Sequence, residues 1–271
     1  MKILGKGRAA ATSDNDIARL AIDLGCHPAV LEAIVKVESG GFGWSKDGRM
    51  KILFEKHWFF KVLRGAQRTR AVNAGLARKG WISPSKGGYK EQRTTAAKYK
   101  ILSNAIDINE EAAFKSISMG KFQIMGFNHG ICGFPSAKAM FDDFTDTEAN
   151  QLKALSNFMI AKKLQNALRN EDFNRIEKVY NGGGLNGKYA ARMRTHCRKL
   201  KAGKWKDFDP DQYGGGIPAV DEKPIQSDIS NNKSETKKTK NNAITVGAGG
   251  AAVVAVVTWW DNIQAWFAGW F

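Results

Sequence analysis

Cysteine is scarce in this chain of 271 residues. The three cysteines, Cys26, Cys132 and Cys197, are odd in number, lie far apart and form no C-x-x-C pair. This spacing indicates neither a disulfide framework nor a zinc site, and it favours a reducing compartment. No two of the histidines have the spacing of a metal-binding motif: His27, His57, His129 and His196. We therefore expect no metal and no other cofactor.

Acidic residues are few relative to basic ones. The chain has 42 Lys and Arg against 26 Asp and Glu, a formal net charge of +16, and residues 1–211 hold 37 and 21 of these. The whole excess therefore lies in this first part. Such a field favours anionic partners, namely nucleic acid, anionic lipid or phosphorylated cell-envelope sugars, and its alternative role is solubility.

A cleavable secretory signal is also not seen. The charged residues Lys6 and Arg8 follow so soon after the N-terminus that the apolar stretch before them is too short for the apolar core of a signal peptide. One long uncharged run occurs, at residues 243–260. A spanning helix needs about 20 apolar residues, so this run is short for one, although Trp259 and Trp260 suit a membrane interface. We expect the tail to associate with a membrane, as a transmembrane helix or at the interface. The alternative is a helix that docks on a partner protein.

The pattern divides the chain into four parts. Residues 1–13 form an N-terminal arm, residues 14–211 a globular domain, residues 212–242 a flexible linker, and residues 243–271 the hydrophobic segment. Within the domain, apolar residues recur at spacings of three and four, which predicts a mainly α fold. Helices are expected at 17–24, 29–37, 58–63, 96–105, 148–168 and 173–179. Residues 51–55 predict a small β-hairpin or extended loop, which makes the class α+β.

Glu38 ends an apolar helical segment. Pro28 suits the first turn of this helix, Gly40 and Gly41 suit its end, and Ile34 precedes Glu38 on the same face. A carboxyl held against apolar side chains, at the negative end of a helix dipole, resists ionisation, so both effects raise its pKa. Such a carboxyl can donate its proton to a leaving group. The alternative is a helix-end glutamate that points to water.

A second carboxylate, Glu55, follows seventeen residues after Glu38, beyond a turn-rich segment. Two carboxyls placed in this way can lie on either side of a cleft, as glycoside hydrolysis requires. One protonates the glycosidic oxygen, and the other acts as a base for water or as a nucleophile. The alternative role of Glu55 is an ion pair with Arg49 or Lys56.

Two further segments carry polar groups beside glycines, at residues 116–128 and after the expected helix at 173–179. Hydroxyl and amide groups can hold sugar hydroxyls and N-acetyl groups, and glycines permit close approach of a substrate. The alternative is an ordinary buried turn. The candidate substrate-binding residues are Ser118, Gly120, Gln123, Asn128, Tyr180 and Asn181.

The chain resembles the N-acetylmuramidase domains of phage endolysins, in which similar segments follow in the same order: residues 37–41, 52–57, 116–128 and 180–182. The resemblance covers about residues 14–200, and this family is similar in fold to goose-type lysozymes and soluble lytic transglycosylases. It implies a lysozyme-like fold and cleavage of the β-1,4 bond between N-acetylmuramic acid and N-acetylglucosamine. It also implies that Glu38 is the general acid and Glu55 the second carboxylate. Two positions depart from the family pattern, Met119, where tryptophan is frequent, and Gly183, where proline is frequent.

The resemblance implies a peptidoglycan-degrading endolysin that lyses a bacterial host. One alternative is a lytic transglycosylase, which leaves anhydro-muramic ends, and another is a membrane-disrupting or virion structural protein. The expected partners are peptidoglycan glycan strands and a membrane, with no specific nucleic acid, and the expected state is a monomer. The expected location is the host cytoplasm or inner membrane, from which the enzyme acts on the cell wall or periplasm during lysis.

Overall fold

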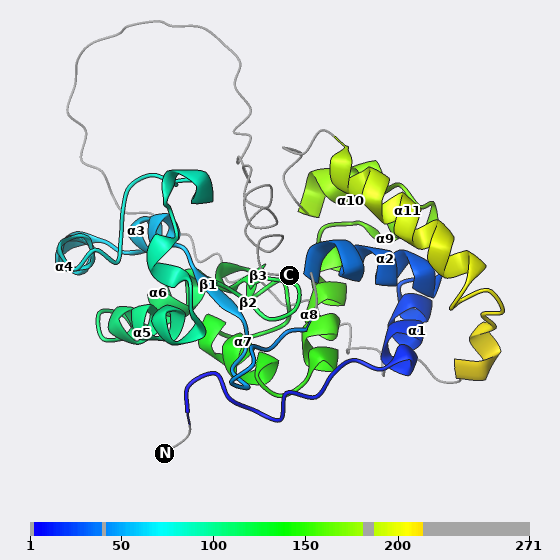
Figure 1. The fold of residues 1–271 in the computed structure, drawn as a ribbon, viewed down its shortest axis with the longest axis horizontal. Helices are drawn as coiled ribbons and strands as arrows, with labels where there is room; N and C mark the ends of the chain where they lie inside the picture. Colours follow the sequence, from blue (N-terminus) through cyan, green and yellow to red (C-terminus); the bar gives the residue numbers. More distant parts are fainter. Residues whose placement is uncertain (1–2, 40–41, 181–186, 214–271) are drawn as a thin grey trace, which may run out of the picture.

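The fold is mainly helical, with one small sheet near its centre (Figure 1). The computed structural model describes residues 3–39, 42–180 and 187–213. The helices are α1 (Asp14–Asp23), α2 (Pro28–Ser39), α3 (Lys56–Val62), α4 (Gly65–Asn73), α5 (Thr95–Ile106), α6 (Glu110–Lys115), α7 (Ala137–Phe144), α8 (Glu148–Ala161), α9 (Gln165–Arg169), α10 (Phe173–Tyr180) and α11 (Lys188–Ala202). The strands are β1 (Ile52–Phe54), β2 (Ile117–Met119) and β3 (Ile124–Met125), and the 3-10 turns are η1 (Pro84–Lys86), η2 (Lys90–Gln92), η3 (Gly126–Asn128) and η4 (Pro210–Tyr213). The mainly α class with a small β region is confirmed.

Side-chain caps set the starts of several helices. The hydroxyl of Ser13 accepts the Asp16 N–H at 3.2 Å, and the Asp16 carboxylate accepts the Ser13 N–H at 2.8 Å, which forms a capping box before α1. These caps satisfy backbone donors that have no partner within the helix. Single side chains accept the equivalent N–H at the starts of α5, α6, α7 and α8: Thr94, Asn109, Ser136 and Thr147.

Most of the expected helices form with ends within three residues of the prediction. The single helix expected at 148–168 was wrong, because the chain turns between α8 and α9. Lys163 adopts a φ of 55°, and the Leu164 N–H donates to the Met159 carbonyl at 2.9 Å, so the α-helical bonding ends there. Helices α4, α6, α7 and α11 were not expected. In α11 a narrow apolar stripe is buried within a basic sequence: Tyr189, Ala190, Met193, Cys197 and Leu200.

The sheet is antiparallel, with strand order β1-β2-β3. The hairpin expected around residues 51–55 does not form from neighbouring residues alone, because β1 pairs with β2, which lies more than sixty residues later. In this register Leu53 lies opposite Ser118, and Ser118 lies opposite Met125 of β3. The tight hairpin is the one between β2 and β3. The sheet therefore joins two segments that the sequence analysis had treated separately.

The central helix of the core is α2. Leu31, Ile34 and Val37 are fully buried, and α2 packs against α1 and α11. Figure 1 shows α2 between α11 and the sheet, with α5, α6 and α7 grouped at the other end of the molecule. The buried side chains form one continuous core from α1 to Trp205. Because this core surrounds α2 on several sides, the position of the helix end that carries Glu38 is strongly restrained.

The three cysteines are buried free thiols. Burial raises the pKa of Cys26 and of Cys132 to about 12, and that of Cys197 to about 11. Since the thiolate is the reactive form, these side chains act as small core residues near neutral pH.

No helix within the described ranges is both long and apolar enough to cross a bilayer. The predicted linker, from residue 214 onward, and the predicted hydrophobic segment at 243–271 lie outside those ranges.

Candidate functional site

The backbone of Glu38 lies in the last turn of α2, one turn beyond the buried Ile34. The placement of its side chain is outside what the structure describes, and so is Asn181. The segment from Phe42 onward is bonded to the sheet. The Gly43 carbonyl accepts the Lys51 N–H at 2.8 Å, and the Lys51 carbonyl accepts the Gly120 N–H at 2.9 Å. These bonds connect the segment after α2 to β1 and to the β2–β3 turn.

Glu55 follows β1 and precedes the first turn of α3, and it is completely buried. The hydroxyl of Tyr89 lies 3.0 Å from each carboxylate oxygen and donates to them, while it accepts the indole N–H of Trp81 at 2.9 Å. His57 Nδ1 lies 3.1 Å from Glu55 Oε2, at contact distance but without the alignment of a hydrogen bond. Burial and the neighbouring charge of Glu55 both raise the pKa of Tyr89, which keeps its hydroxyl a donor.

The alternative role of Glu55 was an ion pair with Arg49 or Lys56. In the structure each of these two cations lies beside a different carboxylate. Arg49 Nη2 lies 2.5 Å from Asp47, and Lys56 Nζ lies 2.6 Å from Glu91. The contacts of Glu55 with Tyr89 come instead from a loop more than thirty residues later. Sequence reasoning had no signal for this pairing, because neither Tyr89 nor Trp81 belongs to a motif.

Ser118 and Gln123 hydrogen-bond to each other across the β2–β3 turn. The Ser118 hydroxyl donates to Gln123 Oε1 at 2.9 Å, and Gln123 Nε2 donates to the Gly120 carbonyl at 2.8 Å. Both side chains are buried. Gly120 has a φ of 73°, and a Cβ at this position would lie 2.5 Å from the Gln151 amide oxygen, so only glycine fits the turn. These bonds give the turn a defined shape. Asn128 lies half-buried at the end of η3, a few residues beyond it.

Tyr180, the last residue of α10, reaches the same turn. Its hydroxyl donates to the Phe122 carbonyl at 3.1 Å, and its ring packs edge-on against Phe158 at 5.5 Å between centroids. The structure thus brings together three of the predicted segments, at Glu55, at the Ser118–Gln123 turn and at Tyr180.

Glu148, in the first turn of α8, is a site residue that the sequence analysis missed. Its carboxylate is buried and accepts the Gly43 N–H at 2.8 Å, the Thr12 N–H and hydroxyl at 3.0 Å each, and the Lys121 ammonium at 2.7 Å. Burial opposes its ionisation, but these donors outweigh that effect and lower the pKa of Glu148. Acidic residues are common in the first turn of a helix, so nothing in the neighbouring sequence distinguishes Glu148 from other helix-start acids.

Glu148 therefore links three segments that are far apart in the sequence. Gly43 belongs to the segment that leaves the end of α2, Lys121 to the β2–β3 turn, and Thr12 to the N-terminal arm. A single carboxylate fixes the distance between the segment that follows Glu38 and the turn that carries Ser118 and Gln123.

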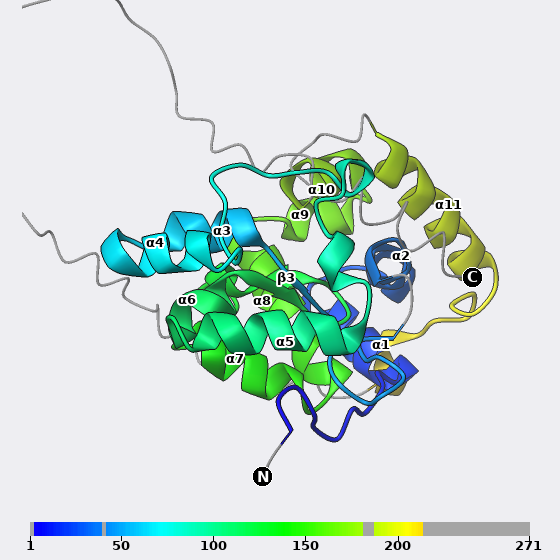
Figure 2. The same cartoon turned by 60° about the vertical axis from the view of Figure 1, so that its left-hand side comes forward.

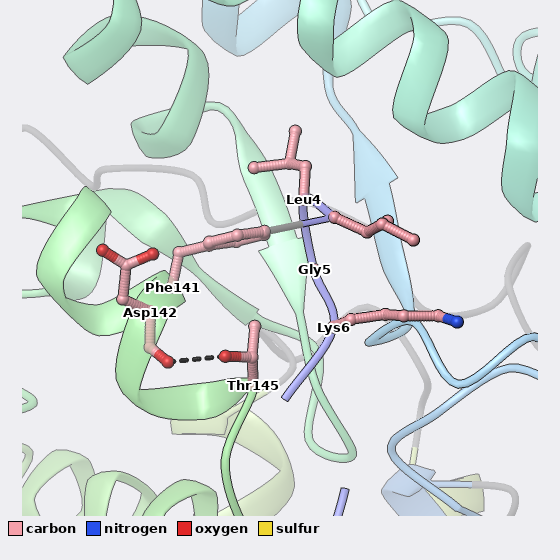
Figure 3. A pocket seen from close by; sticks show the side chains of 7 residues that line it. Leu4, Gly5, Lys6, Phe141, Asp142 and Thr145 are labelled. Carbon is pink, nitrogen blue, oxygen red and sulfur yellow. Dashed lines mark hydrogen bonds between the residues drawn. The ribbon is translucent and has the colours of Figure 1, made fainter. Parts of the chain in front are cut away.

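A small cavity lies elsewhere, between the N-terminal arm and α7 (Figure 3). Its volume is about 130 Å³, and its walls include Leu4, Lys6, Phe141 and Thr145. Ligand sites are commonly about 300–1,000 Å³, so this cavity is too small for two sugar rings. Within the described part of the chain, no group of three His, Cys, Asp or Glu side chains is arranged to hold a metal ion.

Comparison with known proteins identifies the family. The model of the N-acetylmuramidase family matches residues 27–201, which include every predicted site residue. The crystal structure of the Burkholderia AP3 phage endolysin is similar with a TM-score of 0.62 and 30% sequence identity, over 73% of this chain and 74% of that one. No curated relative matches the chain by sequence. The chain therefore belongs to the N-acetylmuramidase family of phage endolysins, enzymes that degrade peptidoglycan.

Proposed function

We propose that this enzyme hydrolyses the β-1,4 bond between N-acetylmuramic acid and N-acetylglucosamine, with Glu38 as the general acid. The observation that carries the proposal is the position of residue 38 at the C-terminal end of α2. Backbone hydrogen bonds among Gly43, Lys51 and Gly120 connect the segment after this helix to the β2–β3 turn. The family match over this region supports it.

In this mechanism the protonated carboxyl of Glu38 gives its proton to the glycosidic oxygen as the bond to the anomeric carbon breaks. The leaving sugar departs with a new hydroxyl group, and positive charge develops on the remaining ring. A water molecule then adds to the anomeric carbon, and its proton passes to a base. The hydrolysis leaves a reducing N-acetylmuramic acid end.

Glu55 is the second carboxylate of the proposal. Glu55 is completely buried, in contact with Tyr89 and His57, so a water molecule can reach this carboxylate only if a covering side chain moves aside. The same burial favours a second candidate, a lytic transglycosylase, which needs only Glu38 because the 6-hydroxyl of muramic acid attacks in place of water. In that case Glu55 has a positioning role.

Product analysis separates the two reactions. Purified, lipid-free sacculi digested by the enzyme should yield fragments with reducing muramic ends, measured by mass spectrometry with and without borohydride reduction. Anhydro-muramic ends, lighter by one water and inert to borohydride, would replace hydrolysis by transglycosylation. Intact sacculi after prolonged digestion would refute both reactions and favour a binding or structural role.

Replacing Tyr89 by phenylalanine tests how Glu55 takes part. The change removes the hydroxyl that donates to the buried carboxylate, and we expect the free energy of unfolding to fall by about 2 kcal/mol, since bonds to charged groups are worth about 1.5–3 kcal/mol. Tyr99→Phe is the matched control. It removes a buried hydroxyl that donates to the neutral Met50 carbonyl at 2.8 Å, so its cost should be nearer 1 kcal/mol.

Urea unfolding and sacculus digestion should be measured on both variants. If Glu55 contributes to the reaction, Tyr89→Phe lowers kcat about tenfold and Tyr99→Phe leaves it unchanged. Equal kcat values in the two variants would limit Glu55 to a role in stability.

Association of residues 243–271 with a membrane, and the route by which the enzyme reaches the cell wall, stay predictions of the sequence. Monomeric state is likewise part of the proposal.

A further inference from the structure

Two segments of the domain each carry eight Lys and Arg without an acidic residue, namely residues 187–206 and the segment that follows Glu55. Residues 56–86, which we call the basic arm, contain eight Lys and Arg and no Asp or Glu. The arm comprises α3, α4 and the loop through η1. Within the described part of the chain, Lys56 is the one Lys or Arg of the arm at ion-pair distance from a carboxylate, that of Glu91. Five of the others are exposed to solvent and produce a strong local positive potential: Lys61, Arg64, Arg70, Lys79 and Lys86.

Several cations of the arm are held in place by contacts other than ion pairs. Lys61 Nζ lies 4.3 Å above the ring of Trp58, and the Arg68 guanidinium lies 4.6 Å from the ring of Phe60. Arg68 Nε also donates to the Leu63 carbonyl at 2.9 Å. Cation–π contacts leave the positive charge intact, so these side chains are ordered without being neutralised.

The arm is continuous with the candidate site. It begins at the residue after Glu55, and Trp58 of α3 stacks against Phe127 at 4.3 Å between centroids. Phe127 belongs to η3 and directly precedes Asn128. Figures 1 and 2 both show α3 and α4 together beside the sheet, at the opposite end of the molecule from α11. The arm therefore lies directly beside the candidate site.

We propose that the basic arm binds the acidic stem peptides of the peptidoglycan strand on which the enzyme acts. This inference rests on the proposed function, because it takes the glycan strand as the substrate. The stem peptides attach to muramic acid next to the scissile bond and carry free carboxylates. Exposed cations that flank a site raise the local concentration of an anionic polymer and steer it. The arm contributes affinity for the strand, and the chemistry stays at Glu38.

A charge-matched pair of variants tests the proposal. The arm variant carries Lys61→Gln, Arg70→Gln and Lys79→Gln, at three exposed positions. The control carries Lys188→Gln, Arg198→Gln and Lys199→Gln on the exposed face of α11, so both lose the same charge. Each is assayed in the full chain on sacculi with intact stem peptides and on glycan strands from which an amidase has removed them.

We expect the arm variant to raise KM on intact sacculi about tenfold with kcat unchanged, and to match the wild type on stripped strands. The α11 control should match the wild type on both substrates. An equal rise in KM for both variants, or a rise that persists on stripped strands, would overturn the proposal.

A binding measurement keeps the arm separate from the reaction. Each set of changes is combined with Glu38→Gln, and the proteins are sedimented with intact or stripped sacculi at low and high salt. The proposal is supported if the arm variant binds intact sacculi more weakly than the protein without the arm changes and if this binding is sensitive to salt. That support stands even if the wild type fails to cleave sacculi, a result that would refute only the hydrolase assignment. Loss of binding to phosphatidylglycerol vesicles with unchanged binding to sacculi would instead assign the arm to lipid.

Discussion

Glu38→Gln should lower the rate of sacculus digestion by about 10²- to 10⁴-fold, the range expected when a general acid is removed. Glutamine keeps the size and shape of the side chain but has no acidic proton to give to the glycosidic oxygen. The rate is measured as release of soluble muropeptides from purified, lipid-free sacculi, so that membrane effects of the tail do not contribute.

Two controls make this result specific. Glu110→Gln changes an exposed acid in the first turn of α6 and should leave activity unchanged. The thermal midpoint of Glu38→Gln should equal that of the wild type, since loss of activity through unfolding would have another meaning. Full lytic activity of a folded Glu38→Gln variant would move the general acid to another residue.

The second large effect is on stability. Glu148→Gln should reduce the free energy of unfolding at pH 7 by about 3 kcal/mol, because it leaves the Lys121 ammonium without its buried carboxylate and weakens the bonds from Gly43 and Thr12. Asp142→Asn is the matched control. It breaks the exposed Asp142–Lys138 pair, 2.6 Å long, and should cost less than 1 kcal/mol.

The loss of folding stability caused by Glu148→Gln should also depend on pH. The pKa of Glu148 is lower in the folded protein than its ordinary value of 4.5, so ionised Glu148 contributes stability above that value. This contribution disappears as the pH falls through the folded pKa. Urea unfolding should therefore show the full difference from wild type at pH 7 and a smaller one at pH 3. A constant difference at both pH values would show that the carboxylate charge is not the stabilising feature.

The broad fold class and the start of α8 were predictable because their causes are local. Thr147 directly precedes an apolar periodic segment and caps it with its own side chain, so a short window of sequence contains the whole interaction. Helix α11 was missed for the opposite reason. Its apolar stripe is narrow among many basic residues, and only packing against α2 makes those few positions the buried face.

The contacts of the candidate site are likewise of two kinds, local ones that the sequence indicates and long-range ones that it does not. The Ser118–Gln123 turn was recognisable because the polar side chains and glycines that shape it lie within six residues of one another. The contact from Tyr89 to Glu55 spans more than thirty residues, and the one from Glu148 to Gly43 spans about a hundred. No periodicity or motif records such pairs.

By itself, the sequence of this protein determined its family, its mainly α class and the position of Glu38 at a helix end, because these depend on residues that are neighbours along the chain. Only the tertiary structure decided that Glu55 is enclosed by Tyr89 and His57, that Glu148 joins the segment after α2 to the β2–β3 turn, and that the basic arm lies beside the site. The reason is physical. Each of these arrangements depends on burying charged or aromatic groups against partners that the folded core brings together.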